Sequence, residues 1–300
     1  MLVGSAPSEL KLGTTTVTGV RRGAGLIYDS DVAAFQKDSG ATQVGPILAL
    51  VDYLKAESLW DYARFYPMKS AQNAGSGSTV YGLGGLTSNN MTLVNSPTWG
   101  SDGVTFDGST QYGQSDTGDL SVYDEAAVFL RAAPTLASAA DSGYAIRCCV
   151  GNYRSATPAG TSGYALGGAT GLLGGETIAI VYTVTSDTSD GGRRLGSSLY
   201  SWAAEEDYTA VYQTGDLNAI WKNKTSVAID RQAAVTTTSS LGPSDLGSSI
   251  DGLVVGGQRN NGTIVATTGA GDVSLVLLYA GNAALTTTQR EAITDLINAL

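Results

Sequence analysis

The spacing of hydrophobic and polar positions along the chain changes twice. Short β-branched runs punctuated by glycines open the chain and predict small strands over residues 1–30. The spacing then becomes that of amphipathic helices, and from residue 75 onward that of short strands bounded by turn residues. We therefore expect a β leader over 1–30, a helical module over 31–74 and a β-sandwich over 75–300 that ends in a short helix.

Two helices are expected within residues 31–66. Asp31 is the expected N-cap of the first, which should end at Gly40. Pro46 suits the first turn of the second helix, which should run on to Tyr66–Pro67. The positions on its inward face would be Ile47, Leu48, Val51, Leu54, Lys55, Leu59, Trp60 and Tyr62.

Strand-length segments follow one another from residue 75, which predicts a mainly β, antiparallel, jelly-roll-type sandwich. The expected strands are 91–94, 103–106, 126–131, 144–151, 176–184, 208–213, 218–222, 252–256 and 273–280. The run at 272–281 is apolar on both faces and should be a central strand. A capping box at Thr288–Glu291 should start a terminal helix whose inward face is Ile293, Leu296, Ile297 and Leu300.

Composition narrows the function classes. The chain carries 17 basic and 27 acidic side chains, a net charge of -10, with 39 glycines. An acidic chain without a basic run is a poor ligand for nucleic acid or for acidic membrane surfaces. No apolar stretch reaches the ~20 residues that span a bilayer, so no membrane insertion is expected. Residues 1–13 lack the pattern of a signal peptide, and Cys148 and Cys149 are adjacent strand residues unsuited to pairing, so synthesis in a cytoplasm is expected.

Catalysis is disfavoured by what the chain lacks. Histidine is absent, which removes Ser-His-Asp and Cys-His nucleophiles and imidazole metal ligands. Carboxylates remain, but Glu205, Glu206 and Asp207 are consecutive, so neighbours would point to opposite faces of a strand. We interpret them as a solvated acidic turn and expect no enzyme activity, with a polysaccharide depolymerase as the enzymatic alternative. The glycine-rich stretches 81–86 and 163–176 lack the phosphate-loop pattern and are interpreted as loops and strand kinks.

Three segments resemble the laminin-G-like members of the concanavalin A-like lectin/glucanase superfamily. They are GVTFDGSTQYGQSD at 103–116, LNAIWKNKTSVA at 217–228 and the ending DVSLVLLYAGNAALTTTQREAITDLINAL at 272–300. The resemblance implies a concanavalin A-like sandwich and glycan binding. It also makes calcium a candidate ligand, although no cofactor is otherwise expected. The carboxylates that could hold calcium are Asp102, Asp107, Asp116, Asp119, Asp187 and Asp190.

Residues 29–68 resemble the helical lead-in of tailed-bacteriophage virion proteins, and residues 11–29 resemble the glycine-punctuated leader of phage head and tail appendages. This resemblance implies a virion structural protein, made in the host cytoplasm, whose leader attaches it to other capsid or tail proteins. It also implies a homo-oligomer, with a trimer as the first expectation. Two roles stay open: a tail-fibre or baseplate adhesin that binds host surface glycans, and a capsid decoration or head fibre protein without a ligand.

A glycan site needs aromatic platforms beside polar groups. Aromatic residues flanked by serine and acidic residues gather in the glycine- and serine-rich middle of the β region. The candidate ligand-binding residues are Tyr200, Trp202, Tyr208 and, in a separate turn, Trp99.

Overall fold

The computed structural model describes residues 10–12, 15–17, 19–22, 25–116, 122–134, 145–156, 160–170, 177–183, 193–197, 208–213, 220–226, 230–231, 253–260, 263–266 and 271–300. Within these residues the chain is mainly antiparallel β, which confirms the fold class predicted from the sequence. None of the helices in this part of the chain is long and apolar enough to cross a membrane.

Two large antiparallel sheets form the sandwich within the described residues. The nine-stranded sheet has the order β19 (Asp230–Arg231), β15 (Arg193–Ser197), β14 (Thr177–Thr183), β13 (Gly160–Thr170), β12 (Ala145–Ala156), β20 (Leu253–Val255), β10 (Tyr112–Ser115), β7 (Met91–Val94), β6 (Thr79–Val80). The eight-stranded sheet has the order β18 (Thr225–Ser226), β17 (Ile220–Lys222), β16 (Tyr208–Gln213), β11 (Glu125–Pro134), β23 (Gly271–Gly281), β9 (Val104–Phe106), β8 (Thr98–Trp99), and β5 (Ala63–Pro67) also pairs with β23. Separate hairpins are formed by β1 (Leu10–Leu12) with β2 (Thr15–Val17), β3 (Gly19–Arg22) with β4 (Gly25–Asp29), and β21 (Gly257–Asn260) with β22 (Thr263–Ala266).

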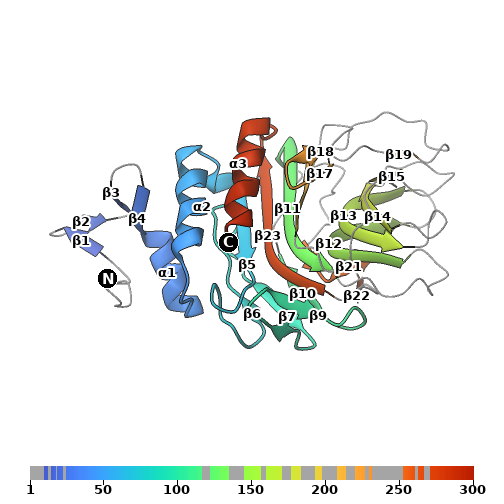
Figure 1. Cartoon of the computed structure of the whole chain (residues 1–300), viewed down its shortest axis with the longest axis horizontal. Coiled ribbons are helices and arrows are strands. Elements are labelled where there is room, and N and C mark those ends of the chain that lie inside the picture. Colours follow the sequence, from blue (N-terminus) through green and yellow to red (C-terminus); the bar gives the residue numbers. More distant parts are fainter. Residues whose placement is uncertain are drawn as a thin grey trace.

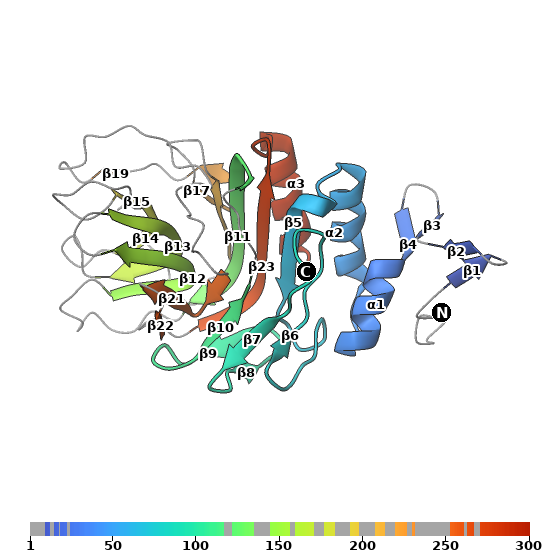
Figure 2. The ribbon, with the colours of Figure 1, turned by 180° about the vertical axis from the view of Figure 1, so that it is seen from behind.

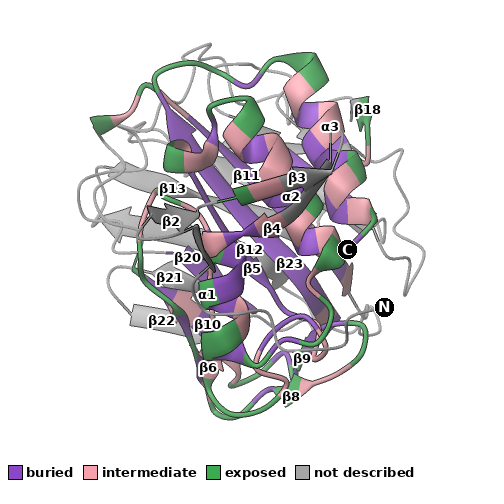
Figure 3. Cartoon of the chain, turned by 90° about the vertical axis from the view of Figure 1, so that its left-hand side faces the viewer, coloured by how far each residue is buried: buried purple, intermediate pink, exposed green. Residues whose placement is uncertain are grey.

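The molecule is arranged in layers. Helices α2 (Gly45–Ala56) and α3 (Thr287–Asn298) lie on the outer face of the eight-stranded sheet, whose other face meets the nine-stranded sheet (Figures 1 and 2). Helix α1 (Ser30–Ser39) lies beyond α2, and the leader hairpins lie at the end of the molecule farthest from the sheets. Figure 3 looks onto this side, where exposed and intermediate helix surfaces cover buried strands.

Strand β23 is the centre of the core, as its sequence predicted. It pairs with β11 along one edge and with β5 and β9 along the other. Leu275, Val276, Leu277 and Leu278 are all fully buried, although alternate side chains point to opposite faces. Both faces are covered because helices lie on one side and the second sheet on the other, which explains the continuous apolar run.

The expected helical module departs from the sequence prediction after residue 56. Helix α2 ends at Ala56, Ser58 adopts a left-handed backbone with φ 58°, and a single 3-10 turn η1 (Trp60–Tyr62) follows. Residues Ala63–Pro67 then form β5 instead of continuing the helix. All five residues of β5 are buried, so no alternation of polar and apolar positions marked them as a strand.

Both helix starts predicted from capping residues are shifted by two positions. Asp29, not Asp31, caps α1, because it ends β4 in an extended conformation and accepts the N–H groups of Asp31 and Val32. Gly40 ends α1 in the left-handed region with φ 72°, as predicted. In α3 the capping box joins Thr286 and Gln289 rather than residues 288 and 291. In each case a second residue of the same type lies two positions away, so the sequence alone did not show which of the two caps the helix.

Helix α3 docks on the sheet through a mixed face. Ile293 and Ile297 are fully buried there, as predicted, while Leu296 is only partly buried. Arg290 is 8% exposed, and its guanidinium carbon lies 3.6 Å from the ring centroid of Trp221 in β17. This cation–π contact ties the helix to the sheet edge.

The glycine-rich stretch that begins at residue 163 and the two adjacent cysteines both lie in strands of the nine-stranded sheet. β13 covers Gly160–Thr170 and pairs with β12 and β14, so residues 163–170 of the stretch interpreted as loops and strand kinks form regular sheet, and residues 171–176 lie outside the described residues. Cys148 and Cys149 lie in β12, where the pairing register with β13 shifts between Cys148 and Val150.

Candidate functional site

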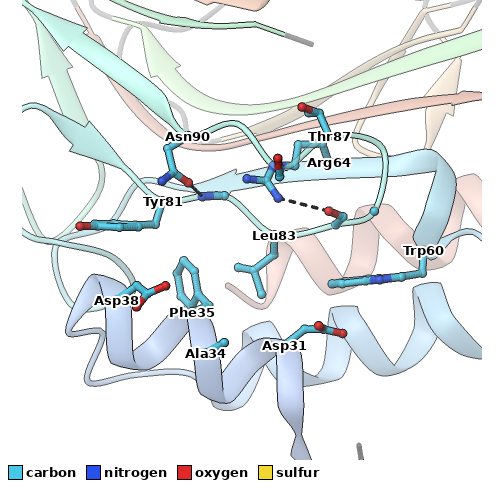
Figure 4. A pocket seen from close by; sticks show the side chains of 14 residues that line it. Asp31, Ala34, Phe35, Asp38, Trp60, Arg64, Tyr81, Leu83, Thr87 and Asn90 are labelled. Carbon is cyan, nitrogen blue, oxygen red and sulfur yellow. Dashed lines mark hydrogen bonds between the residues drawn. The ribbon is translucent and has the colours of Figure 1, made fainter. Parts of the chain in front are cut away.

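A cleft of about 400 Å³ opens between α1 and the segment 81–90, and we refer to it as the α1 cleft (Figure 4). Its volume is within the range of sites for small ligands. The lining residues come from α1, η1, β5 and the 81–90 segment: Asp31, Ala34, Phe35, Asp38, Trp60, Arg64, Tyr81, Gly82, Leu83, Gly84, Gly85, Thr87, Ser88 and Asn90.

Helix periodicity supplies one wall of the α1 cleft. Four residues of α1 line the cleft with the i, i+3, i+4, i+7 spacing that places side chains on one helical face: Asp31, Ala34, Phe35 and Asp38. Phe35 is buried among the core residues, whereas the two aspartates and Ala34 are exposed. The wall therefore has an apolar base and acidic positions at either end.

Aromatic and aliphatic side chains form much of the rest. Trp60 and Tyr81 are half-buried and pack against the core while lining the cleft, and Leu83 is 3% exposed. Figure 4 shows Trp60 at one end of the cleft and Tyr81 at the other. Partly exposed aromatic rings at both ends can stack on flat apolar faces of a ligand.

An ion-pair cluster holds Trp60 in place. The Lys55 ammonium lies 2.6 Å from a carboxylate oxygen of Asp29 and 2.5 Å from one of Asp31, and 4.6 Å from the centroid of the Trp60 ring. Burial lowers the pKa of Lys55, but its hydrogen bonds to both carboxylates and their charges outweigh burial and raise the pKa. One cation thus links the cap of α1, the end of α2 and the indole.

Arg64 from β5 lies in the wall opposite α1, between Asn90 and Thr87 in Figure 4. The residue is 5% exposed. Its Nη1 donates to the Gly84 carbonyl at 3.2 Å and its Nη2 to the Asn89 carbonyl at 2.7 Å. Its guanidinium carbon lies 5.5 Å from the centroid of the Tyr66 ring.

Several polar groups of the α1 cleft are available to a ligand. Asn90 uses its side-chain oxygen to accept the Gly82 N–H at 3.1 Å, which leaves its amide donors for other partners. Asp38 makes no side-chain hydrogen bond or ion pair within the described residues. The Thr87 hydroxyl accepts from the Asn89 N–H and can still donate. The cleft lining therefore combines hydrogen-bond donors and acceptors with an apolar base.

The sequence-predicted aromatic site is described only in part. Tyr200 and Trp202 lie outside the described residues, as do Glu205, Glu206 and Asp207. Tyr208 opens β16 and pairs with Ala132. Trp99 in β8 is half-buried and donates its indole N–H to the Gly77 carbonyl at 3.0 Å, and it does not line the α1 cleft. Ligand binding by these four aromatic residues stays a prediction.

Among the calcium candidates, Asp102, Asp107 and Asp116 are described, whereas Asp119, Asp187 and Asp190 lie outside the described residues. The carboxylate of Asp107 accepts the N–H groups of Ser109, Thr110 and Gln111 within its own turn. Burial raises the pKa of Asp107, but these backbone donors outweigh it and hold the pKa well below its usual range. No group of three or more Cys, Asp or Glu side chains placed to hold a metal ion occurs in the described part of the chain.

Sequence reasoning missed the cleft residues as a group. Trp60 was expected on the inward face of a helix, Tyr81 was noted only as part of the glycine-rich stretch 81–86, and Arg64 was not singled out. A usable local signal was the Asp31–Asp38 face of α1, which carries acidic groups beside Phe35. The other residues reach the cleft only because β5 pairs with β23 and carries the 81–90 segment with it.

No protein-family model matches the chain, and no curated protein matches it. Among solved structures, the botulinum neurotoxin serotype D binding domain aligns over 79% of this chain and 52% of its own, with 7% identity and a TM-score of 0.46. The CBM40 of the Ruminococcus gnavus IT-sialidase, bound to alpha2,3 sialyllactose, aligns over 57% of this chain and 83% of its own, with 14% identity and a TM-score of 0.37. The NanB sialidase from Streptococcus pneumoniae aligns over 56% of this chain and 24% of its own, with 13% identity and a TM-score of 0.37. The chain thus spans about half the length of the neurotoxin domain it matches.

Proposed function

We propose that this β-sandwich protein is a non-catalytic glycan-binding component of a tailed-bacteriophage virion, and that the α1 cleft holds the glycan. The observation that carries glycan binding is the pairing of two half-buried aromatic residues, Trp60 and Tyr81, with hydrogen-bonding groups that the fold leaves available. Sugar rings present apolar faces to aromatic side chains and hydroxyls to polar ones.

A binding role fits the α1 cleft better than hydrolysis does. The carboxylates that line it, Asp31 and Asp38, are seven residues apart on α1, which separates their backbones by about 10 Å along the helix axis. Retaining glycosidases hold two carboxyl groups about 5 Å apart and inverting ones about 6.5–9.5 Å apart, and both classes need two carboxyl groups that are free to act as acid and base or nucleophile. Asp31 also forms an ion pair with Lys55, the cation that lies against Trp60, so its carboxylate has a structural role instead of a catalytic one.

Replacing Trp60 by Ala is expected to weaken glycan binding by about tenfold or more, because the ligand loses a stacking platform. The measurement is binding of the labelled protein to a glycan array, followed by titration of the best ligand. Trp99→Ala is the matched control and should bind like the wild type, since its indole N–H is satisfied by Gly77 outside the cleft. If Trp60→Ala bound normally and Trp202→Ala did not, the ligand site would lie in the middle of the β region and not in the α1 cleft.

The virion role is supported by the resemblance of residues 11–68 to phage appendage proteins and by the place of the leader. The hairpins β1–β2 and β3–β4 lie at the end of the molecule farthest from the sheets, a position that suits contact with a neighbouring subunit (Figure 1). Such an arrangement would attach the protein through its leader, as a homo-oligomer, with the sandwich outward.

Gold labelling of assembled phage particles with an antibody to residues 75–300 is expected to mark the tail. Host attachment is a tail function, so tail label is the result that a glycan-binding adhesin requires. Label on the head would favour the second role, a capsid decoration protein, which should bind empty heads and raise their thermal stability. Particles without label would contradict a virion location.

A further inference from the structure

We propose that the α1 cleft selects acidic glycans and that Arg64 receives the carboxylate of the sugar. This inference rests on the proposed glycan-binding function and adds the chemical class of the ligand. Its basis is a buried cation whose charge no carboxylate of the described residues balances.

The hydrogen bonds of Arg64 leave much of the guanidinium unused. Of its five N–H donors, one on Nη1 and one on Nη2 reach the neutral carbonyls of Gly84 and Asn89. Nε is buried and has no hydrogen-bond partner. Tyr66 presents its ring face to the guanidinium, with 5.5 Å between the guanidinium carbon and the ring centroid.

A charge in this position is costly without an anion. Taking a guanidinium out of water loses hydration energy, and neutral carbonyls return only part of it. Arg64 is 5% exposed, lines the cleft and pairs with no carboxylate of the described residues, so an anion bound in the cleft would supply its counter-charge. A planar guanidinium fork matches the two oxygens of a carboxylate better than it matches a single hydroxyl.

Gly82 keeps this part of the wall clear of side chains. A Cβ at position 82 would lie 2.7 Å from Arg64 Nε and 2.6 Å from Tyr66 Cε1, closer than real contacts allow. Any side chain there would push the guanidinium out of the wall. The place of Arg64 in the α1 cleft therefore depends on a glycine at 82.

The two acidic residues that line the cleft do not cancel the preference of Arg64 for an anionic ligand. Asp31 is paired with Lys55, and its side chain is 50% exposed. Asp38 is unpaired within the described residues, but it is exposed at the far end of α1, where water screens its charge. The cation lies at the buried wall, where its field is screened least. A sugar carboxylate would therefore sit against Arg64, while Asp38 would act on it only as a weak, partly screened like charge.

The test is an array that presents each acidic glycan beside its carboxyl methyl ester, a matched pair that differs in charge alone. The full-length protein is expected to bind at least one acid about tenfold more tightly than its ester. Arg64→Lys keeps the charge but loses the fork, and should reduce that ratio to about threefold or less. Equal binding to acid and ester by the wild type would overturn acidic selectivity while leaving glycan binding intact. Binding to no glycan on the array would overturn the proposed function itself.

A second variant keeps the test valid if Arg64→Lys fails to fold. Asp38→Asn removes an exposed carboxylate that makes no hydrogen bond within the described residues, so folding should be unaffected. It is expected to tighten binding of the acid by about threefold through the loss of like-charge repulsion, without tightening binding of the ester. Asp102→Asn makes the same charge change outside the cleft lining and should alter neither. Equal tightening of acid and ester by Asp38→Asn would contradict an anionic group in the cleft.

Discussion

Replacing Asn73 by Ala is expected to lower the free energy of unfolding by about 3–5 kcal/mol. Asn73 is 1% exposed and follows β5. Its amide nitrogen donates to the carbonyls of Pro67 at 2.7 Å and Tyr81 at 2.8 Å, and its side-chain oxygen accepts the Tyr81 N–H at 3.0 Å. The truncated residue would leave these three backbone groups without a partner, and each orphaned buried group costs about 1–3 kcal/mol.

This asparagine also determines where an aromatic wall of the α1 cleft lies, since it holds both backbone polar groups of Tyr81. Urea unfolding with linear extrapolation measures the change in stability. The matched control is Asn89→Ala, which removes one exposed side-chain bond to the Asp116 carbonyl and should cost less than about 1 kcal/mol. Equal losses in the two variants would show that the Asn73 network does not stabilise the fold as argued.

Replacing Gly84 by Ala should be similarly damaging, with a loss of about 3–5 kcal/mol and a collapse of the α1 cleft. Gly84 has φ 119°, which L-residues rarely adopt. A Cβ there would overlap the Ala63 carbonyl oxygen and lie 2.8 Å from the Ala63 carbonyl carbon. Backbone atoms of β5 cannot move aside cheaply, because β5 is paired with β23 in the core.

The control for this variant separates the two causes of destabilisation. Gly77 has φ 75° and open space around its Cβ position, so Gly77→Ala carries only the backbone cost, about 1–2 kcal/mol. The excess loss in Gly84→Ala then measures the collision with β5. Thermal or urea unfolding gives both values, and losses of the same size would mean that β5 and the 81–90 segment can separate without penalty.

Structural features that depend on residues close together in the chain could be predicted from the sequence. The left-handed residue that ends α1 is Gly40 and the first turn of α2 contains Pro46, because backbone conformation limits the residues allowed there. β7 and β16 have the predicted bounds, since alternating apolar positions between turn residues determine them. β23 could be recognised as central from its unbroken apolar run.

The α1 cleft could not be predicted in the same way, because its residues are brought together by pairing between distant parts of the chain. Leu59 to Tyr66 carry an apolar spacing compatible with a helix, and the sheet overrode it: Phe65 pairs with Leu277 in β23. That pairing buries Arg64 and places it in the lining of the same cleft as Trp60.

The sequence by itself therefore determined the fold class, the helix-ending glycine, the central strand and the exclusion of histidine-based chemistry, because each depends on composition or on residues a few positions apart. Only the tertiary structure decided that residues 63–67 are a strand, that Arg64 is a buried cation without a carboxylate partner among the described residues, and that Trp60 and Tyr81 line one cleft. Those features depend on which surfaces are buried against each other, and burial is a property of the assembled layers and not of any local pattern.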